Sequence, residues 1–94
     1  MAILGLLQLE IIIRDSNHLK EKRSTIKSLK ETIRNKFNVS VAETADYDMW
    51  NKSEISISKV SNESIHIRKE FQKIINDIES RYPVDIISKQ EEVW

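Results

Sequence analysis

Cysteine is absent from the 94-residue chain, and glycine and proline occur once each. The lack of cysteine excludes disulfides and thiolate metal sites. A single glycine, Gly5, excludes both a glycine-rich loop that cradles phosphate and the tight turn of a nucleophile elbow. His18 and His66 are the only histidines, and their spacing fits no metal site. We therefore expect no metal, no cofactor and no catalytic residue, so that the protein is not an enzyme.

Long apolar runs are also missing, since none approaches the roughly 20 residues that a membrane span needs. The start MAILGLLQLEIII lacks the basic leader and the small-residue cleavage site of a signal peptide. We expect a cytoplasmic protein without membrane contact. The composition, 39% hydrophobic and 32% charged, is typical of a globular fold. The length predicts one domain, residues 1–94, because most domains hold about 100–150 residues.

Hydrophobic periodicity predicts four strands. Alternation at period two indicates a first strand in which Ile3, Gly5, Leu7 and alternate residues beyond them share one face. The predicted strands cover residues 3–13, 39–42, 55–59 and 84–89. The last five residues, QEEVW, receive no assignment.

Two helices are predicted from apolar residues at helical spacing. The first begins after the cap residues 15–17 and ends near Asn38, and the second begins after 61–63 and stops at Pro83. The element order β-α-β-β-α-β predicts an α+β ferredoxin-like sandwich. In this fold, both helices cover one face of a four-stranded antiparallel sheet.

The other face of the first strand carries Leu4, Leu6 and Ile12. These side chains would leave apolar surface in water on a sheet face that no helix covers. We expect this face to be a dimer interface and the protein to be a homodimer.

The net charge of zero hides a strong asymmetry. Residues 18–37 hold seven cations and two anions, which gives this segment a charge of +5 and the remainder −5. Several of these cations fall in HLKEKR, at the start of the first helix, where the helix dipole disfavours positive charge by about 0.3–1 kcal/mol per residue. The candidate anion- or RNA-binding residues are Lys20, Lys22, Arg23, Lys27, Lys30 and Arg34.

Five of these cations recur at intervals of three and four residues and should form one stripe beside the apolar face of the helix. They are Lys20, Arg23, Lys27, Lys30 and Arg34. Such a stripe suits a run of RNA phosphates. The alternative is a solvated rim, in which the aliphatic stems pack on the core edge and the charged heads stay in water.

Aromatic residues are few, at 6% of the chain, and the predicted first and third strands contain none. Stacking of bases on a sheet platform therefore fits poorly. Tyr47 and Trp50 lie in the connection between the second and third strands and are the candidate residues for stacking or partner contact. The alternative is that Trp50 folds onto the sheet edge or packs in a dimer.

The sequence resembles the bacterial YlxP-like family of small proteins over almost its whole length. The resemblance rests on HLKEKR at 18–23, RNKFNVSVAE at 34–43, Asp48 with Trp50, and Ser61-Asn62. It implies a ferredoxin-like fold and genes that often neighbour translation-initiation and ribosome-maturation genes, but no established activity. His18 stands where the family usually has serine, so Ser16 or Asn17 is expected to cap the helix.

Two hypotheses follow from different functional classes. One is an RNA- or ribosome-binding accessory of translation or ribosome maturation, with ribosomal RNA or ribosomal subunits as the partner. The other is a homodimeric protein-interaction module with no nucleic-acid ligand.

Overall fold

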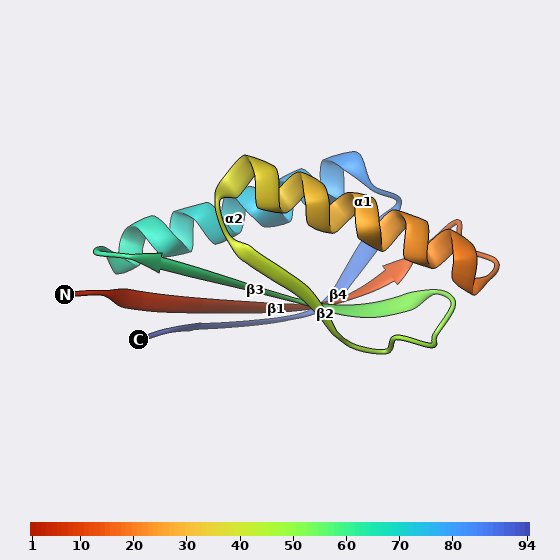
Figure 1. Cartoon of the computed structure of the whole chain (residues 1–94), viewed down its shortest axis with the longest axis horizontal. Helices are drawn as coiled ribbons and strands as arrows, with labels where there is room; N and C mark the ends of the chain where they lie inside the picture. The colour runs from red at the N-terminus through yellow and green to blue at the C-terminus, as the bar shows by residue number, and fades with distance from the viewer.

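The computed structural model describes all 94 residues and has the predicted order of elements. The elements are β1 (Ile3–Ile13), α1 (Leu19–Phe37), β2 (Ser40–Ala45), β3 (Lys52–Ser61), α2 (Ser64–Arg81) and β4 (Val84–Val93). The four strands form one antiparallel sheet in the order β2-β3-β1-β4, and both helices cover one face of it (Figure 1). This arrangement confirms the α+β ferredoxin-like sandwich. Neither helix has a stretch that is both long and apolar enough to cross a membrane.

The core lies between the sheet and the helices, and β1 supplies its centre. Leu7, Leu9 and Ile11 are fully buried on the predicted face of that strand. Gly5 continues the same face, beneath Ile67 and Phe71 of α2. A Cβ atom at Gly5 would collide with the Ile67 side chain and lie 3.1 Å from the Phe71 ring. The glycine is therefore needed for the close approach of α2 to the sheet.

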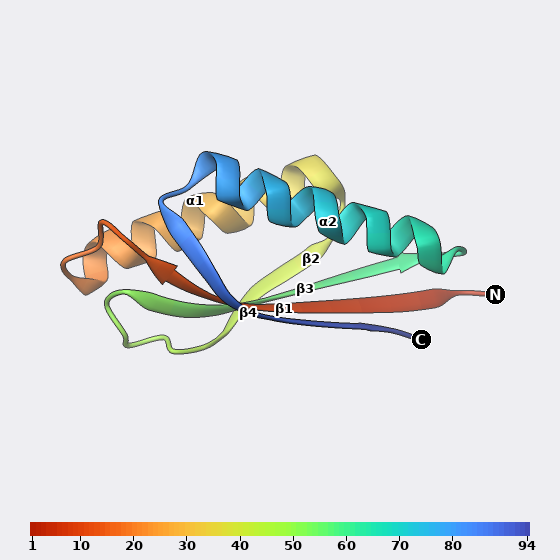
Figure 2. The same ribbon diagram turned by 180° about the vertical axis from the view of Figure 1, so that it is seen from behind.

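β1 has the predicted bounds, whereas each of the other three strands extends beyond its predicted end. β2 begins at Ser40, one residue later than predicted, and continues to Ala45; β3 is longer at both ends, and β4 continues through QEEV to Val93. Gln90 and Val93 pair with Gln8 and Gly5 of β1, and the backbones of Leu4 and Trp94 exchange two hydrogen bonds. Figure 2 shows the resulting arrangement, with both chain termini at the same end of the sheet.

The helix starts differ from the prediction. His18 is the N-cap of α1 and makes no side-chain cap hydrogen bond. The hydroxyl of Ser16 instead bonds the Trp50 carbonyl at 2.5 Å, and the Asn17 N–H donates to Glu21 Oε2 at 3.2 Å. The expected caps, Ser16 and Asn17, are therefore wrong, because the Ser16 side chain is used to hold a distant loop.

The helix ends agree with the prediction. Asn38 closes α1 in a left-handed conformation, with φ of 49°. The second helix ends at Arg81, two residues before Pro83, which cannot continue a helix.

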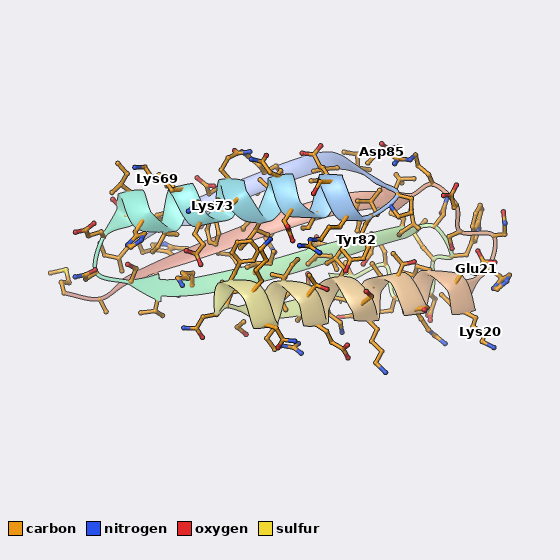
Figure 3. All side chains as sticks on the ribbon, turned by 90° about the horizontal axis from the view of Figure 1, so that it is seen from above. Lys20, Glu21, Lys69, Lys73, Tyr82 and Asp85 are labelled. Carbon is orange, nitrogen blue, oxygen red and sulfur yellow. The ribbon has the colours of Figure 1, made fainter.

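Tyr82 joins the two helices. Its hydroxyl lies 3.1 Å from Ser28 Oγ and 3.0 Å from Thr32 Oγ1 of α1. Lys36 of α1 also reaches Asp77 of α2, with Nζ 2.7 Å from Oδ1. These contacts establish which side of α1 faces α2, and Figure 3 shows Tyr82 between the helices.

Candidate nucleic-acid interface

The predicted stripe of cations lies on the flank of α1 that faces away from α2. We call Lys20, Arg23, Lys27, Lys30 and Arg34 the basic flank. Two contacts orient it: Arg34 Nη2 donates to the Val41 carbonyl of β2 at 3.4 Å, and Arg23 Nη2 lies 3.9 Å from Asp48 Oδ1. In Figure 3, Lys20 projects from the start of α1 away from α2. The basic flank therefore runs above the β2 edge of the sheet.

The charges of the basic flank are almost free of intramolecular partners. Its members are exposed, except for the half-buried Lys30. Only Arg23 lies within 4.0 Å of a carboxylate, and that carboxylate, on Asp48, is 96% exposed. Exposed pairs of this kind contribute about 0–1 kcal/mol. Ion pairing within the fold therefore does not account for this concentration of cations.

Lys22 does not belong to this surface, and its predicted role in anion binding is wrong. Its side chain is fully buried, and its Nζ lies 2.7 Å from both Glu43 Oε2 and the Asp46 carbonyl. It also donates to the Tyr47 carbonyl at 3.2 Å, while Ser53 Oγ donates to the same Glu43 oxygen at 2.6 Å. An external anion cannot reach this ammonium group.

The burial of Lys22 can be predicted from its helical spacing to apolar residues, although not from the number of charges in the segment. Lys22 stands four residues before Ile26 and seven before Leu29, which are both buried, so it shares the core-facing stripe of α1. Its partners are also polar residues at inward-facing places. Glu43 is only 15% exposed and Ser53 is fully buried. A lysine at a helix position where the periodicity predicts a buried apolar residue is therefore a candidate for a buried ion pair.

The loop between β2 and β3, residues 46–51, is tied to the start of α1. Besides the two bonds from Lys22, the Ser16 hydroxyl bonds the Trp50 carbonyl, and the Ile13 N–H donates to the Asn51 carbonyl at 2.8 Å. The loop therefore lies beside the first turns of the basic flank. Tyr47, Met49 and Trp50 expose 55%, 43% and 49% of their surface there.

This placement brings both predicted aromatics, Tyr47 and Trp50, next to the basic flank. About half of Trp50 is covered by the rest of the fold and about half is exposed. Met49 adds a third large apolar side chain that sequence reasoning did not select. The loop that carries these aromatics therefore lies next to the start of the basic flank, and Arg23 and Asp48 make the contact between them.

Glu21 reduces the cost of placing cations in the first turn of α1. Its carboxylate accepts the Asn17 N–H and lies 2.8 Å from His18 Nε2. A negative charge at this end of a helix is favourable. The residue also borders an open hollow of about 520 Å³, whose rim includes His18, Lys20 and Asp15. Opposite charges offset one another around this hollow, so the members of the basic flank other than Lys20 lie further along α1.

The outer face of the sheet does not carry one continuous apolar patch. Leu4, 45% exposed, lies opposite Val60 at one end, and Leu6 is the next outward residue. Ile12 lies at the other end, opposite Lys52. Between them is a polar strip that borders a hollow lined by Gln8, Glu10, Glu54, Ser88 and Gln90. The predicted dimer residues are therefore divided between two ends of the sheet.

A separate charged cluster holds the helices together. Lys36 Nζ and Arg81 Nε lie 2.7 and 2.9 Å from Asp77 Oδ1. Burial raises the pKa of the Asp77 carboxyl, but these hydrogen bonds and the two positive charges outweigh burial and hold that pKa below its ordinary value. No group of three or more metal-binding side chains occurs in the structure.

Residues 4–91 match the family described as Protein of unknown function (DUF503). The chain is 36% identical to Uncharacterized protein YlxP of Bacillus subtilis (strain 168) over 78 residues, which cover 83% of this chain and 85% of that one.

Two solved structures share the fold at low sequence identity. A dimeric protein of unknown function and ferredoxin-like fold from Bacteroides fragilis is 12% identical, with a TM-score of 0.56 and coverage of 98% of this chain and 94% of that one. The de novo designed protein Foldit4 is 11% identical, with a TM-score of 0.55 and coverage of 100% and 97%. These likenesses concern the fold alone, whereas the match over residues 4–91 and the identity to YlxP show that the chain belongs to the DUF503 family.

Proposed function

We propose that the protein binds RNA through the basic flank of α1. It acts as a non-enzymatic accessory of translation or ribosome maturation, with ribosomal RNA or ribosomal subunits as its partner in the cytoplasm. The observation that carries this proposal is the lack of ion-pair partners for Lys20, Lys27, Lys30 and Arg34 on one outward flank. Their charges are available to a polyanion.

The geometry favours contact with the RNA backbone. From Lys20 to Arg34 the basic flank extends about 21 Å along α1, at 1.5 Å per residue. Lysine and arginine heads at three- and four-residue intervals can meet successive phosphates without reading bases. Neither β1 nor β3 carries an aromatic residue, so the sheet offers no stacking platform. We expect little dependence on RNA sequence.

The direct test is an RNA titration of two charge-reversal variants with equal net charge. Lys27→Glu with Lys30→Glu changes the basic flank, whereas Lys69→Glu with Lys73→Glu makes the same change on α2. The second pair is exposed, forms no ion pair and lies on the other helix (Figure 3). We expect the first variant to lose about tenfold or more in affinity for single-stranded RNA and the second to lose much less. Equal losses, or none, would overturn the proposal.

Association with ribosomal subunits tests the named partner. We expect the protein to cosediment with subunits at low salt, to dissociate at high salt, and to lose this association in the Lys27→Glu, Lys30→Glu variant. A complex that persists in high salt would instead support a protein interaction.

A homodimer is the second candidate, supported by one end of the outer sheet face. Leu4, Val60 and Trp94 expose 45%, 66% and 61% of their surface, and Leu4 pairs with both of the others across the sheet. The similar protein from Bacteroides fragilis is described as dimeric. Sedimentation equilibrium should show a dimer that Leu4→Glu with Val60→Glu dissociates. A monomer at high micromolar concentration would exclude it.

A further inference from the structure

We propose that the β2–β3 loop is a rigid base-stacking element, so that the RNA bound by this surface is single-stranded where it meets the loop. Tyr47 and Trp50 would stack on unpaired bases, and Lys22 would act as a positioning residue that fixes the loop. This inference rests on the proposed function, because the basic flank supplies the phosphate contacts beside it.

The loop is held by bonds to its backbone, which leaves its large side chains free. The Asp46 carbonyl accepts hydrogen bonds from Lys22 Nζ at 2.7 Å and from the Met49 N–H at 3.1 Å. Asp46 itself adopts φ of 63°, a conformation that aspartate tolerates better than most residues. Ser16 holds the Trp50 carbonyl at the other end of the loop. A loop fixed in this way loses little conformational freedom when a ligand binds.

The exposed side chains of the loop do not serve the core. The phenylalanines of the chain, Phe37 and Phe71, are buried, and Tyr82 lies between the helices. Tyr47 and Trp50, by contrast, remain about half exposed although the loop that carries them is fixed. Aromatic faces next to a positively charged groove or flank are the usual means of binding single strands without sequence preference.

The basic flank leads directly to the loop, because Arg23 Nη2 lies 3.9 Å from Asp48 Oδ1. In the proposed arrangement, a strand whose phosphates follow the flank reaches the loop that carries Tyr47 and Trp50, and its bases stack there. Bases paired in a duplex do not offer free faces to such residues, whereas unpaired bases do. Stacking adds about 5- to 150-fold in affinity per base. We therefore expect a preference for single-stranded over duplex RNA.

Asp48 lies on this surface, and its charge should oppose RNA binding. Its carboxylate is 96% exposed and offsets the charge of Arg23. Asp48→Asn should tighten the binding of single-stranded RNA several-fold at low salt, because a repulsion of phosphate is removed. Weaker binding by this variant would overturn the proposed path of the strand.

The test compares a single-stranded RNA of about 12 nucleotides, a duplex of similar length, and inorganic polyphosphate, which carries phosphates but no bases. Trp50→Ala should weaken binding of the single strand by about fivefold or more and leave polyphosphate binding unchanged. Ile65→Ala is the control, since Ile65 is also a large exposed apolar residue but lies at the start of α2, the other helix. It should leave both affinities unchanged.

The outcomes separate this inference from the proposed function. If wild type binds the three ligands equally and Trp50→Ala changes none of them, the stacking role is refuted and phosphate binding by the basic flank stands. If wild type binds none of them, the proposed function fails as well. The first of these outcomes is also the one expected if Tyr47 and Trp50 bind a protein partner and not RNA bases.

The positioning role of Lys22 has its own readout. Lys22→Met should release the loop and weaken single-strand binding while polyphosphate binding persists, because Lys22 is buried and is not part of the basic flank. Ser16→Ala is the milder companion variant, since it removes the hydroxyl that bonds the Trp50 carbonyl and, more weakly, the His18 carbonyl, and leaves the Lys22 bonds in place. It should reduce single-strand affinity in the same selective way. Equal loss for both ligands, or none, in the folded variants would refute this role.

Discussion

Replacing Lys22 by methionine tests the buried ion pair that joins α1 to the hairpin of β2 and β3. The change removes an ammonium group that is fully buried and lies 2.7 Å from Glu43 Oε2. Glu43 keeps only the Ser53 hydroxyl as a partner, the Tyr47 carbonyl loses its donor, and the Asp46 carbonyl keeps only the Met49 N–H. Breaking one side of a buried pair in this way costs about 3–5 kcal/mol.

The exposure of Glu43 decides where in this range the loss should fall. Its side chain is 15% exposed, so water can partly solvate the abandoned carboxylate. We therefore expect a loss near the lower limit, about 3 kcal/mol. Domains of this size have about 5–15 kcal/mol of total stability, and such a loss lowers the melting temperature by about 12–24 °C.

Urea denaturation followed by circular dichroism measures this loss, and two further variants interpret it. Lys27→Met makes the same substitution at an exposed site of the same helix and should change stability by less than about 0.5 kcal/mol. Lys22→Met with Glu43→Leu removes both charges and should recover part of the loss, because no buried charge is left unpaired and only neutral groups, the Tyr47 carbonyl and the Ser53 hydroxyl, lose their partner. A loss below about 1 kcal/mol for Lys22→Met alone would refute the buried pair as a structural tie.

Three other predictions concern separate parts of the fold. Because the pKa of Asp77 is lowered in the folded state, its contribution to stability is complete above about pH 4 and is lost as the pH falls through the lowered value. The gap in unfolding free energy between wild type and Asp77→Asn should therefore shrink in acid, and a constant gap would contradict the assignment. Gly5→Ala should cost about 1–3 kcal/mol in denaturation, because its methyl group meets the α2 side chains, and an unchanged midpoint would contradict that contact. Lys20→Glu with Arg23→Glu should leave the melting temperature unchanged or raise it, because each change stabilises the fold by a few tenths to about 1 kcal/mol, while RNA binding falls. A clear drop in melting temperature with unchanged binding would assign these cations to folding.

The sequence contained most of the fold because the apolar pattern is consistent along each element. Alternation in β1 placed Leu7, Leu9 and Ile11 on the inner face, and the structure confirms this. The polar segment QEEV gave no such signal. It forms the end of the edge strand β4. This segment is held in the sheet by its backbone pairing with β1 and not by an apolar pattern of its side chains.

The candidate site was predicted less well, because the position of a charge on a helix matters more than its presence. Lys22 and Lys20 both lie in HLKEKR, yet one is buried in an ion pair and the other is exposed. The distinction depends on Glu43, which is distant in the sequence and is brought close by the fold. The outer-face residues Leu4 and Ile12 likewise share one strand but are separated along it by polar residues.

The salt dependence of RNA affinity tests the central claim most directly. If all five cations of the basic flank contact phosphates of a single strand, the logarithm of affinity should fall against the logarithm of salt concentration with a slope of about −3 to −4. Lys27→Glu with Lys30→Glu should make this slope shallower by at least about 1.4, which corresponds to two lost contacts. A wild-type slope near zero, or a slope that this variant leaves unchanged, would contradict RNA binding by the basic flank.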